Sequence, residues 1–204
     1  MHPAATVPAV QVLVVHAHPS RASFSRALCD VTVNALERAG HEVNAVSLYD
    51  EDFDPRMTAE ERIAYHTDQP IVSGHVADHA DLVRAAEALV FVFPTWWFGL
   101  PAMLKGWLDR VLVPGVAFDF DDAGRVVPAM QHVRRIVAIT TYGASRWRVA
   151  VMNDAGRRTL LRALRVACGR RTRRTWIGLY RMDAAGERRR TAFLDRVDKR
   201  MGRL

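Results

Sequence analysis

One stretch, residues 89–110, constrains the fold more than any other part of the chain. It opens with an unbroken apolar run at 89–93, which is typical of a strand buried on both faces of a parallel sheet. Pro94 ends this strand, because proline cannot donate a hydrogen bond to a sheet ladder. From Pro101 the apolar residues recur at spacings of three and four, which predicts a helix.

The loop between this strand and helix is rich in aromatic residues: it holds Thr95, Trp96, Trp97, Phe98 and Gly99. In an open α/β sheet such a loop lies at the carboxyl end of a strand, where ligands bind. Large aromatic side chains are costly to expose to water, so they need a partner. They could fold back onto the core, but their place at this edge favours contact with a flat aromatic ligand.

The remaining segments extend the same pattern. Strands are expected at 10–16, 42–48, 133–139 and 175–179, and a small hairpin at 117–120 and 126–127. Helices are expected at 23–39, 72–86, 147–167 and 186–201, with a short helix at 58–66 inside the long acidic loop 49–70. The alternation predicts an α/β fold: a flavodoxin-like five-stranded parallel sheet, order 2-1-3-4-5, with helices on both faces. At this length we expect one domain, residues 1–204.

Three serines lie where the first strand meets the first helix: Ser20, Ser23 and Ser25. Free N–H groups at a helix start, the positive end of its dipole and nearby hydroxyls together favour an anion. A serine N-cap explains one of the three well, and all three together less well. The absence of Gly-x-Gly-x-x-Gly and of a Walker lysine argues against Rossmann and P-loop nucleotide sites.

The paired histidines and the two cysteines are expected to have structural roles. His75 and His79 lie one helical turn apart, but no third ligand is evident, so a solvated helix face is favoured and no metal is expected. Cys29 and Cys168 are expected to be buried thiols in a reducing compartment, which suggests the cytoplasm. Residues 1–10 lack the features of a signal peptide, and no apolar run is long enough to insert into a membrane.

Charge is distributed unevenly along the chain, whose net charge is +7. Residues 1–133 carry 9 basic and 17 acidic side chains, whereas residues 134–204 carry 20 basic and 5 acidic ones. Arginine supplies 27 of the 29 basic residues, and no known nucleic-acid-binding motif accompanies them. We therefore expect mostly a solvated face, without a nucleic-acid partner, where some arginines help to attract phosphate-bearing cofactors.

Three segments resemble the flavodoxin-like NAD(P)H:quinone oxidoreductases: residues 14–25, residues 93–111, and the Thr-Thr-Tyr-Gly segment at 140–143. Together with Ser20, the cofactor-binding residues that we expect are His18, Ser23, Phe24, Ser25, Pro94, Thr95, Trp96, Trp97, Phe98, Thr140, Thr141, Tyr142 and Gly143. Tyr142 stands where the family has a glycine, so this loop is expected to be tighter or to reach the substrate. The family's proton-relay tyrosine and histidine have no clean counterpart here, so catalytic residues are not assigned.

The resemblance implies transfer of two electrons from NADH or NADPH through a flavin to a quinone. FMN is expected because the single anion site suits one terminal phosphate, with FAD as the alternative if the 49–70 loop covers an adenine. Phe118 and Trp147 are expected to contact substrate, and a homodimer is implied. Two alternatives remain: a reductase of azo or nitro compounds, and a flavin-binding ancillary subunit of a membrane transporter.

Overall fold

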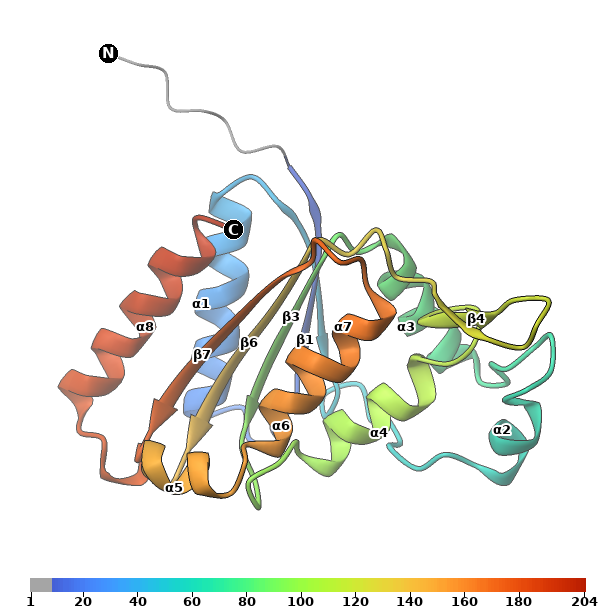
Figure 1. The fold of residues 1–204 in the computed structure, drawn as a ribbon. Coiled ribbons are helices and arrows are strands. Elements are labelled where there is room, and N and C mark those ends of the chain that lie inside the picture. The colour runs from blue at the N-terminus through green and yellow to red at the C-terminus, as the bar shows by residue number, and fades with distance from the viewer. Residues whose placement is uncertain (1–8) are drawn as a thin grey trace, which may run out of the picture.

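A single parallel sheet organises the chain in the computed structural model, which describes residues 9–204 (Figure 1). Its strand order is β2-β1-β3-β6-β7, which confirms the predicted flavodoxin-like order. The strands are β1 (Gln11–His16), β2 (Glu42–Ser47), β3 (Ala88–Pro94), β6 (Arg135–Tyr142) and β7 (Arg173–Tyr180). All four pairings between neighbouring strands are parallel, so the carboxyl ends of the strands share one edge.

Helices cover both faces of the sheet, as predicted. The longer ones are α1 (Phe24–Arg38), α3 (Gly74–Ala85), α4 (Ala102–Val111) and α8 (Glu187–Met201). Shorter ones are α2 (Ala59–Ala64), α5 (Arg146–Val151), α6 (Ala155–Arg158), the π-helical turn η1 (Thr159–Ala163), α7 (Leu164–Ala167) and the 3₁₀ turn η2 (Met182–Ala184). The antiparallel hairpin of β4 (Phe118–Phe120) and β5 (Val126–Pro128) confirms the predicted hairpin.

The sheet separates two hydrophobic cores, and successive residues of a strand pack into one and then the other, because the side chains of a strand alternate between the two faces of the sheet. On one face, Val90 and Val92 of β3 pack with apolar residues of α1 and α8. On the other face, Phe91 and Phe93 pack with residues of α3, α4 and α7, including the fully buried Trp107. Burial on both faces explains why β3 is a continuous apolar run.

The long loop 49–70 is fixed to α4 by a buried ion pair. The expected short helix is confirmed as α2, whose Thr58 and Glu61 form a capping box. Arg110 of α4 places Nε 3.0 Å from both carboxylate oxygens of Glu61, and both side chains are less than a tenth exposed. Arg110 also donates to the carbonyl oxygen of Asp54. The loop is therefore held against the helix that follows the aromatic turn.

Two predicted boundaries are wrong. Strand β6 continues through Thr140 and Thr141 to Tyr142, because these residues stay paired with β7 instead of forming a loop. The single helix expected at 147–167 is broken after α5, where Asn153 and Asp154 have φ values of +62° and +39°. Left-handed residues cannot continue a right-handed helix, so α5 is a separate short segment at the end of β6.

Both cysteines are buried free thiols, as expected. Burial raises the pKa of Cys29 to about 11, so this thiol stays protonated and unreactive at neutral pH. The absence of a signal peptide was expected from residues 1–10, and residues 1–8 of that segment lie outside the described residues.

Candidate functional site at the carboxyl edge of the sheet

The loops after β1, β3 and β6 meet at the carboxyl edge of the sheet. Register places His16 beside Val92, and Pro94 beside Thr141. The Thr95 N–H group donates to the Thr141 carbonyl oxygen at 2.8 Å, and the hydroxyls of Thr95 and Thr140 lie 3.0 Å apart. The second and third candidate loops are thus joined directly by hydrogen bonds.

The start of α1 provides an anion-binding geometry. Ser23 is the N-cap, with φ −80° and ψ 156°, and its hydroxyl accepts from the Arg26 N–H group at 3.1 Å. Within residues 9–204, the N–H groups of Phe24 and Ser25 have no acceptor. Ser20 is exposed just before them, and its N–H group donates to His18 Nδ1 at 3.0 Å. Two free donors at the positive end of a 15-residue helix favour a bound phosphate or carboxylate.

The Ser25 hydroxyl does not contribute to this surface. It is buried and lies 3.3 Å from Nε2 of His16, inside the molecule. Burial, and to a lesser degree the positive charge of Arg26, lowers the pKa of His16 to about 4, so its ring is neutral at pH 7. Of the three serines, Ser25 can therefore offer an anion only its backbone N–H group. No sequence signal distinguished this inward serine from the exposed Ser20.

The aromatic turn Trp96–Gly99 is exposed and strained. The Gly99 N–H group closes it by donating to the Trp96 carbonyl oxygen at 2.9 Å. Its central residues, Trp97 and Phe98, have φ values of +48° and +58°. A left-handed conformation costs a non-glycine residue about 1–2 kcal/mol, and strain of this kind concentrates at ligand sites.

The two indoles of this turn do not fold back onto the core. Trp97 is 97% exposed and Trp96 is 43% exposed. The ring of Trp96 lies 6.1 Å from that of His18 in the first loop. Exposed rings and a helix start with free N–H groups thus lie at the same edge of the sheet, and a ligand with a flat ring and a phosphate needs both.

The Tyr142 side chain faces the interior, in a segment that was expected to form a tighter loop or to reach the substrate. Tyr142 is buried, and its ring stacks on that of Tyr180 with the ring centroids 4.6 Å apart. Its hydroxyl donates a hydrogen bond to the Asp154 carboxylate, whose two oxygens each lie 3.0 Å from the hydroxyl oxygen. Burial and the neighbouring Asp154 carboxylate raise its pKa, so it stays protonated. Only its backbone and the exposed Gly143 remain available at this edge. Asp154, which no motif indicated, instead anchors the break after α5.

The structure separates the two expected substrate residues. Trp147 lies on α5, beside the ends of β6 and β7, and is 64% exposed (Figure 1). Phe118 lies on the β4–β5 hairpin, beyond the far end of α4, where it packs edge-on against Phe120 at 5.8 Å. Because α4 has ten residues and is about 15 Å long, Phe118 does not reach the carboxyl edge of its own chain.

Of the two histidines of α3, His75 is exposed as expected, whereas His79 differs from expectation. His79 is buried, not solvated, and Glu51 brings the third group that the spacing did not reveal, with its Oε2 2.9 Å from His79 Nε2. Trp107 donates to His79 Nδ1 at 3.0 Å, so the ring proton of neutral His79 must sit on Nε2. A metal cation could bind His79 Nε2 only if this proton were removed. The geometry therefore favours a chain of hydrogen bonds from Trp107 through His79 to Glu51 over a metal site.

Comparison with known proteins gives the family. The family described as having a flavodoxin-like fold matches residues 10–199. The chain belongs to this family. No helix within residues 9–204 has both the length and the hydrophobicity needed to cross a bilayer.

Several similar proteins are named as quinone dehydrogenases or quinone oxidoreductases. Human ribosyldihydronicotinamide dehydrogenase [quinone] is 34% identical over 66% of this chain and 64% of its own length. Rat NAD(P)H dehydrogenase [quinone] 1 is 32% identical over 66% and 54%. The chain thus spans less than two thirds of the length of these relatives. The structure of the NAD(P)H:quinone oxidoreductase from Methanothermobacter marburgensis superposes with a TM-score of 0.79, at 25% identity and 96% coverage of both chains.

Proposed function

We propose that the chain is a flavin-dependent NAD(P)H oxidoreductase that passes two electrons to a quinone-type acceptor. The observation that carries the proposal is the strained turn of exposed indoles, Trp96 and Trp97, beside free N–H groups at the start of α1. These groups fit the ring and the phosphate of a flavin respectively. The names of the family members and the matching structure support the same activity.

Each part of the site has a distinct task in this proposal. The N–H groups of Phe24 and Ser25, with the Ser20 hydroxyl, would hold the phosphate. Trp96 and Trp97 would wall the ring and exclude water from one side of it. A bound flavin supplies the redox chemistry, because it accepts a hydride equivalent from reduced nicotinamide and returns two electrons to an acceptor. The chain itself binds and orients the ring for both partners.

We propose FMN as the flavin. The first loop offers one set of free helix-start donors, at Phe24 and Ser25, which suits a single terminal phosphate. Loop 49–70, which would have to cover an adenine of FAD, is held against α4 by Glu61 and Arg110. One structural neighbour, an azoreductase from Bacillus anthracis with 15% identity and a TM-score of 0.73, is described in complex with FMN.

We further propose a homodimer in the cytoplasm. Phe118 cannot reach the carboxyl edge of its own chain, so a role for it at the substrate requires a second copy. Cys29 and Cys168 are buried as free thiols, which fits a reducing compartment.

Steady-state oxidation of NADH and of NADPH, each with a soluble quinone, tests the activity. We expect turnover that depends on added quinone and that follows ping-pong kinetics, because one ring surface serves both substrates in turn. A parallel assay with an azo dye separates the quinone acceptor from the azo alternative. Flavin-loaded protein that oxidises neither nucleotide would contradict the enzymatic proposal.

A further inference from the structure

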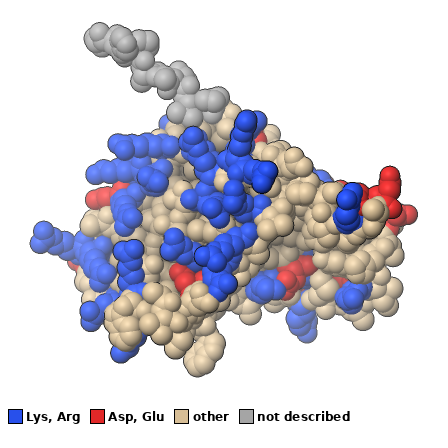
Figure 2. Space-filling model, viewed as in Figure 1, with Lys and Arg blue, Asp and Glu red and all other residues tan. Residues whose placement is uncertain are grey.

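Many arginines crowd the face of the molecule that Figure 2 shows. Figure 2 shows Lys and Arg side chains spread over the side that carries α8, β7 and the α6–α7 segment. Within residues 9–204, none of the arginines of α8 or β7 has a carboxylate oxygen within 4.0 Å. Their charge is therefore not neutralised inside the chain and is available to an anionic partner.

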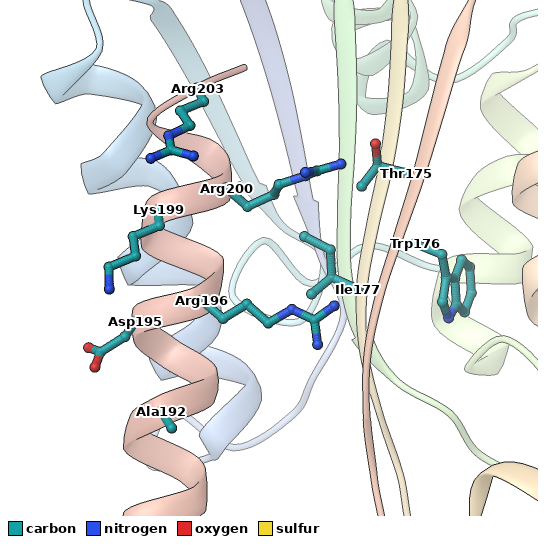
Figure 3. Close-up of a pocket in the computed structure, with 9 residues that line it drawn as sticks. All are labelled: Thr175, Trp176, Ile177, Ala192, Asp195, Arg196, Lys199, Arg200 and Arg203. Atoms are coloured by element: carbon teal, nitrogen blue, oxygen red, sulfur yellow. The ribbon is translucent and has the colours of Figure 1, made fainter.

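A groove runs along this face between β7 and α8, and we call it the β7–α8 groove. Its main part is a depression of about 560 Å³ whose lining includes Ile177, the basic residues Arg196, Lys199, Arg200 and Arg203, and one acidic residue, Asp195. A second depression of about 460 Å³ shares Ala192 and Arg196 and extends the groove to Tyr180 and Arg189. In Figure 3 the side chains of Arg196 and Arg200 extend from α8 towards β7, across the apolar floor formed by Ile177.

Three of the groove arginines form a row along α8. Arg189, Arg196 and Arg200 are separated by seven and four residues, so they lie on one side of the helix, and Arg203 follows in the turn just after its end. At a rise of 1.5 Å per residue the part of this row on α8 is about 16 Å long. A guanidinium group forms paired hydrogen bonds with a phosphate. Four such groups along the groove match a linear chain of phosphates better than a single phosphate group.

We propose that the β7–α8 groove binds the sugar–phosphate backbone of a single nucleic-acid strand. The expectation from the sequence was a solvated face without such a partner, because a linear count of arginines did not reveal their alignment in a groove. A flat bilayer cannot enter a concave groove, whereas a single strand can. The indole of Trp176 points away from the groove towards the other side of β7 (Figure 3), so it does not stack with bases of a strand in the groove.

This geometry specifies the character of binding. Contacts to phosphates, without base stacking on an aromatic ring, give affinity that depends strongly on salt and little on base sequence. For single strands the logarithm of affinity falls with that of salt concentration with a slope of about −0.7 per phosphate contact, so four contacts give about −2.8. Between about 50 and 200 mM salt, this slope weakens binding roughly 50-fold.

Fluorescence anisotropy of a labelled oligothymidylate of roughly 8 nucleotides, titrated with the full chain, measures this binding. We expect the double variant Arg196→Ala/Arg200→Ala to reduce the salt slope by about 1.4, since two contacts are lost. Arg56→Ala/Arg125→Ala removes the same charge from exposed positions outside the groove, and we expect it to keep the slope. Arg196→Lys/Arg200→Lys keeps the charge and should retain most of the slope with weaker affinity.

Three outcomes would overturn the proposal. The first is no binding at the lower salt concentration by protein that melts normally. The second is equal weakening by the groove variant and the control variant, which would indicate general charge attraction. The third is stronger binding to phosphatidylglycerol vesicles that displace the oligonucleotide, which would assign the arginine face to a membrane surface. Thermal unfolding of each variant shows that it is folded, and the lysine variant provides the same test if the alanine variant is not.

Discussion

Replacing Trp97 by alanine separates a role in ligand binding from a role in the fold. Trp97 is 97% exposed, so its side chain buries almost no apolar area that alanine would lose. The free energy of unfolding of the flavin-free protein should therefore change by no more than about 0.5 kcal/mol, as for other surface substitutions. The left-handed backbone, with φ +48°, is strained with either side chain and does not alter this expectation.

The effect on flavin binding should be much larger. An aromatic side chain that stacks on a flat ring contributes about 1–3 kcal/mol in comparable base–aromatic contacts. That loss corresponds to a dissociation constant raised about 5- to 150-fold. Quenching of FMN fluorescence on titration with flavin-free protein measures it, and urea denaturation measures the stability of the same preparation.

Trp107→Ala is the matched control. Trp107 is fully buried and donates to His79, so its loss should cost about 3–5 kcal/mol of stability. The reasoning is refuted if Trp97→Ala lowers stability as much as Trp107→Ala does. It is also refuted if FMN affinity is the same in Trp97→Ala and in the unmodified protein, because the exposed indole would then have no ligand to contact.

Two further predictions concern the anchoring of loop 49–70. Arg110→Ala leaves the carboxylate of Glu61 buried without its partner and should cost about 3–5 kcal/mol, measured by urea denaturation. Burial alone would raise the pKa of Glu61, but hydrogen bonds from Arg110 lower this pKa overall. The stabilisation by the ion pair should therefore be complete at neutral pH and disappear as the pH falls through the lowered pKa of Glu61. A loss of stability in Arg110→Ala that does not depend on pH would contradict the pairing. Gly106→Ala places a methyl group 2.1 Å from the Pro55 carbonyl oxygen and should lower the stability of the protein by about 1–3 kcal/mol. The control Gly74→Ala has no atom within 4 Å of the added methyl group and should not lower it. Equal melting temperatures of the two variants would show that loop 49–70 can move away from α4 at no cost.

The fold was predictable because its main signals are local. The apolar run of β3 and the spacing of apolar residues in α4 identify elements without knowledge of partners, and the alternation of strands and helices leaves few topologies. The short helix α2 was also expected from the sequence, and the structure shows that a capping box of Thr58 and Glu61 begins it. The expected end of β6 at residue 139 is wrong, because pairing of Thr141 and Tyr142 with β7 extends the strand beyond its apolar part. The expected continuous helix at 147–167 is also wrong, because the left-handed backbone of Asn153 interrupts it.

The composition of the site was predictable, but the direction of its side chains was not. The sequence located the aromatic turn and the helix start at one edge, since both follow strands of a parallel sheet. It could not show that Ser25 faces His16 or that Tyr142 faces Asp154, because these contacts join residues whose orientation depends on tertiary packing. The contact of Glu51 with His79 is of the same kind. The roles of the site residues in binding flavin remain predictions.

The absorption spectrum of the purified chain, recorded anaerobically before and after addition of NADH or NADPH, tests the central claim most directly. Flavin-free protein is first mixed with FMN at micromolar concentration, and excess flavin is removed. The account predicts a yellow protein whose visible absorption bleaches with reduced nicotinamide and returns when a quinone is added. Protein that retains neither FMN nor FAD, or a bound flavin that neither nucleotide bleaches, would contradict it.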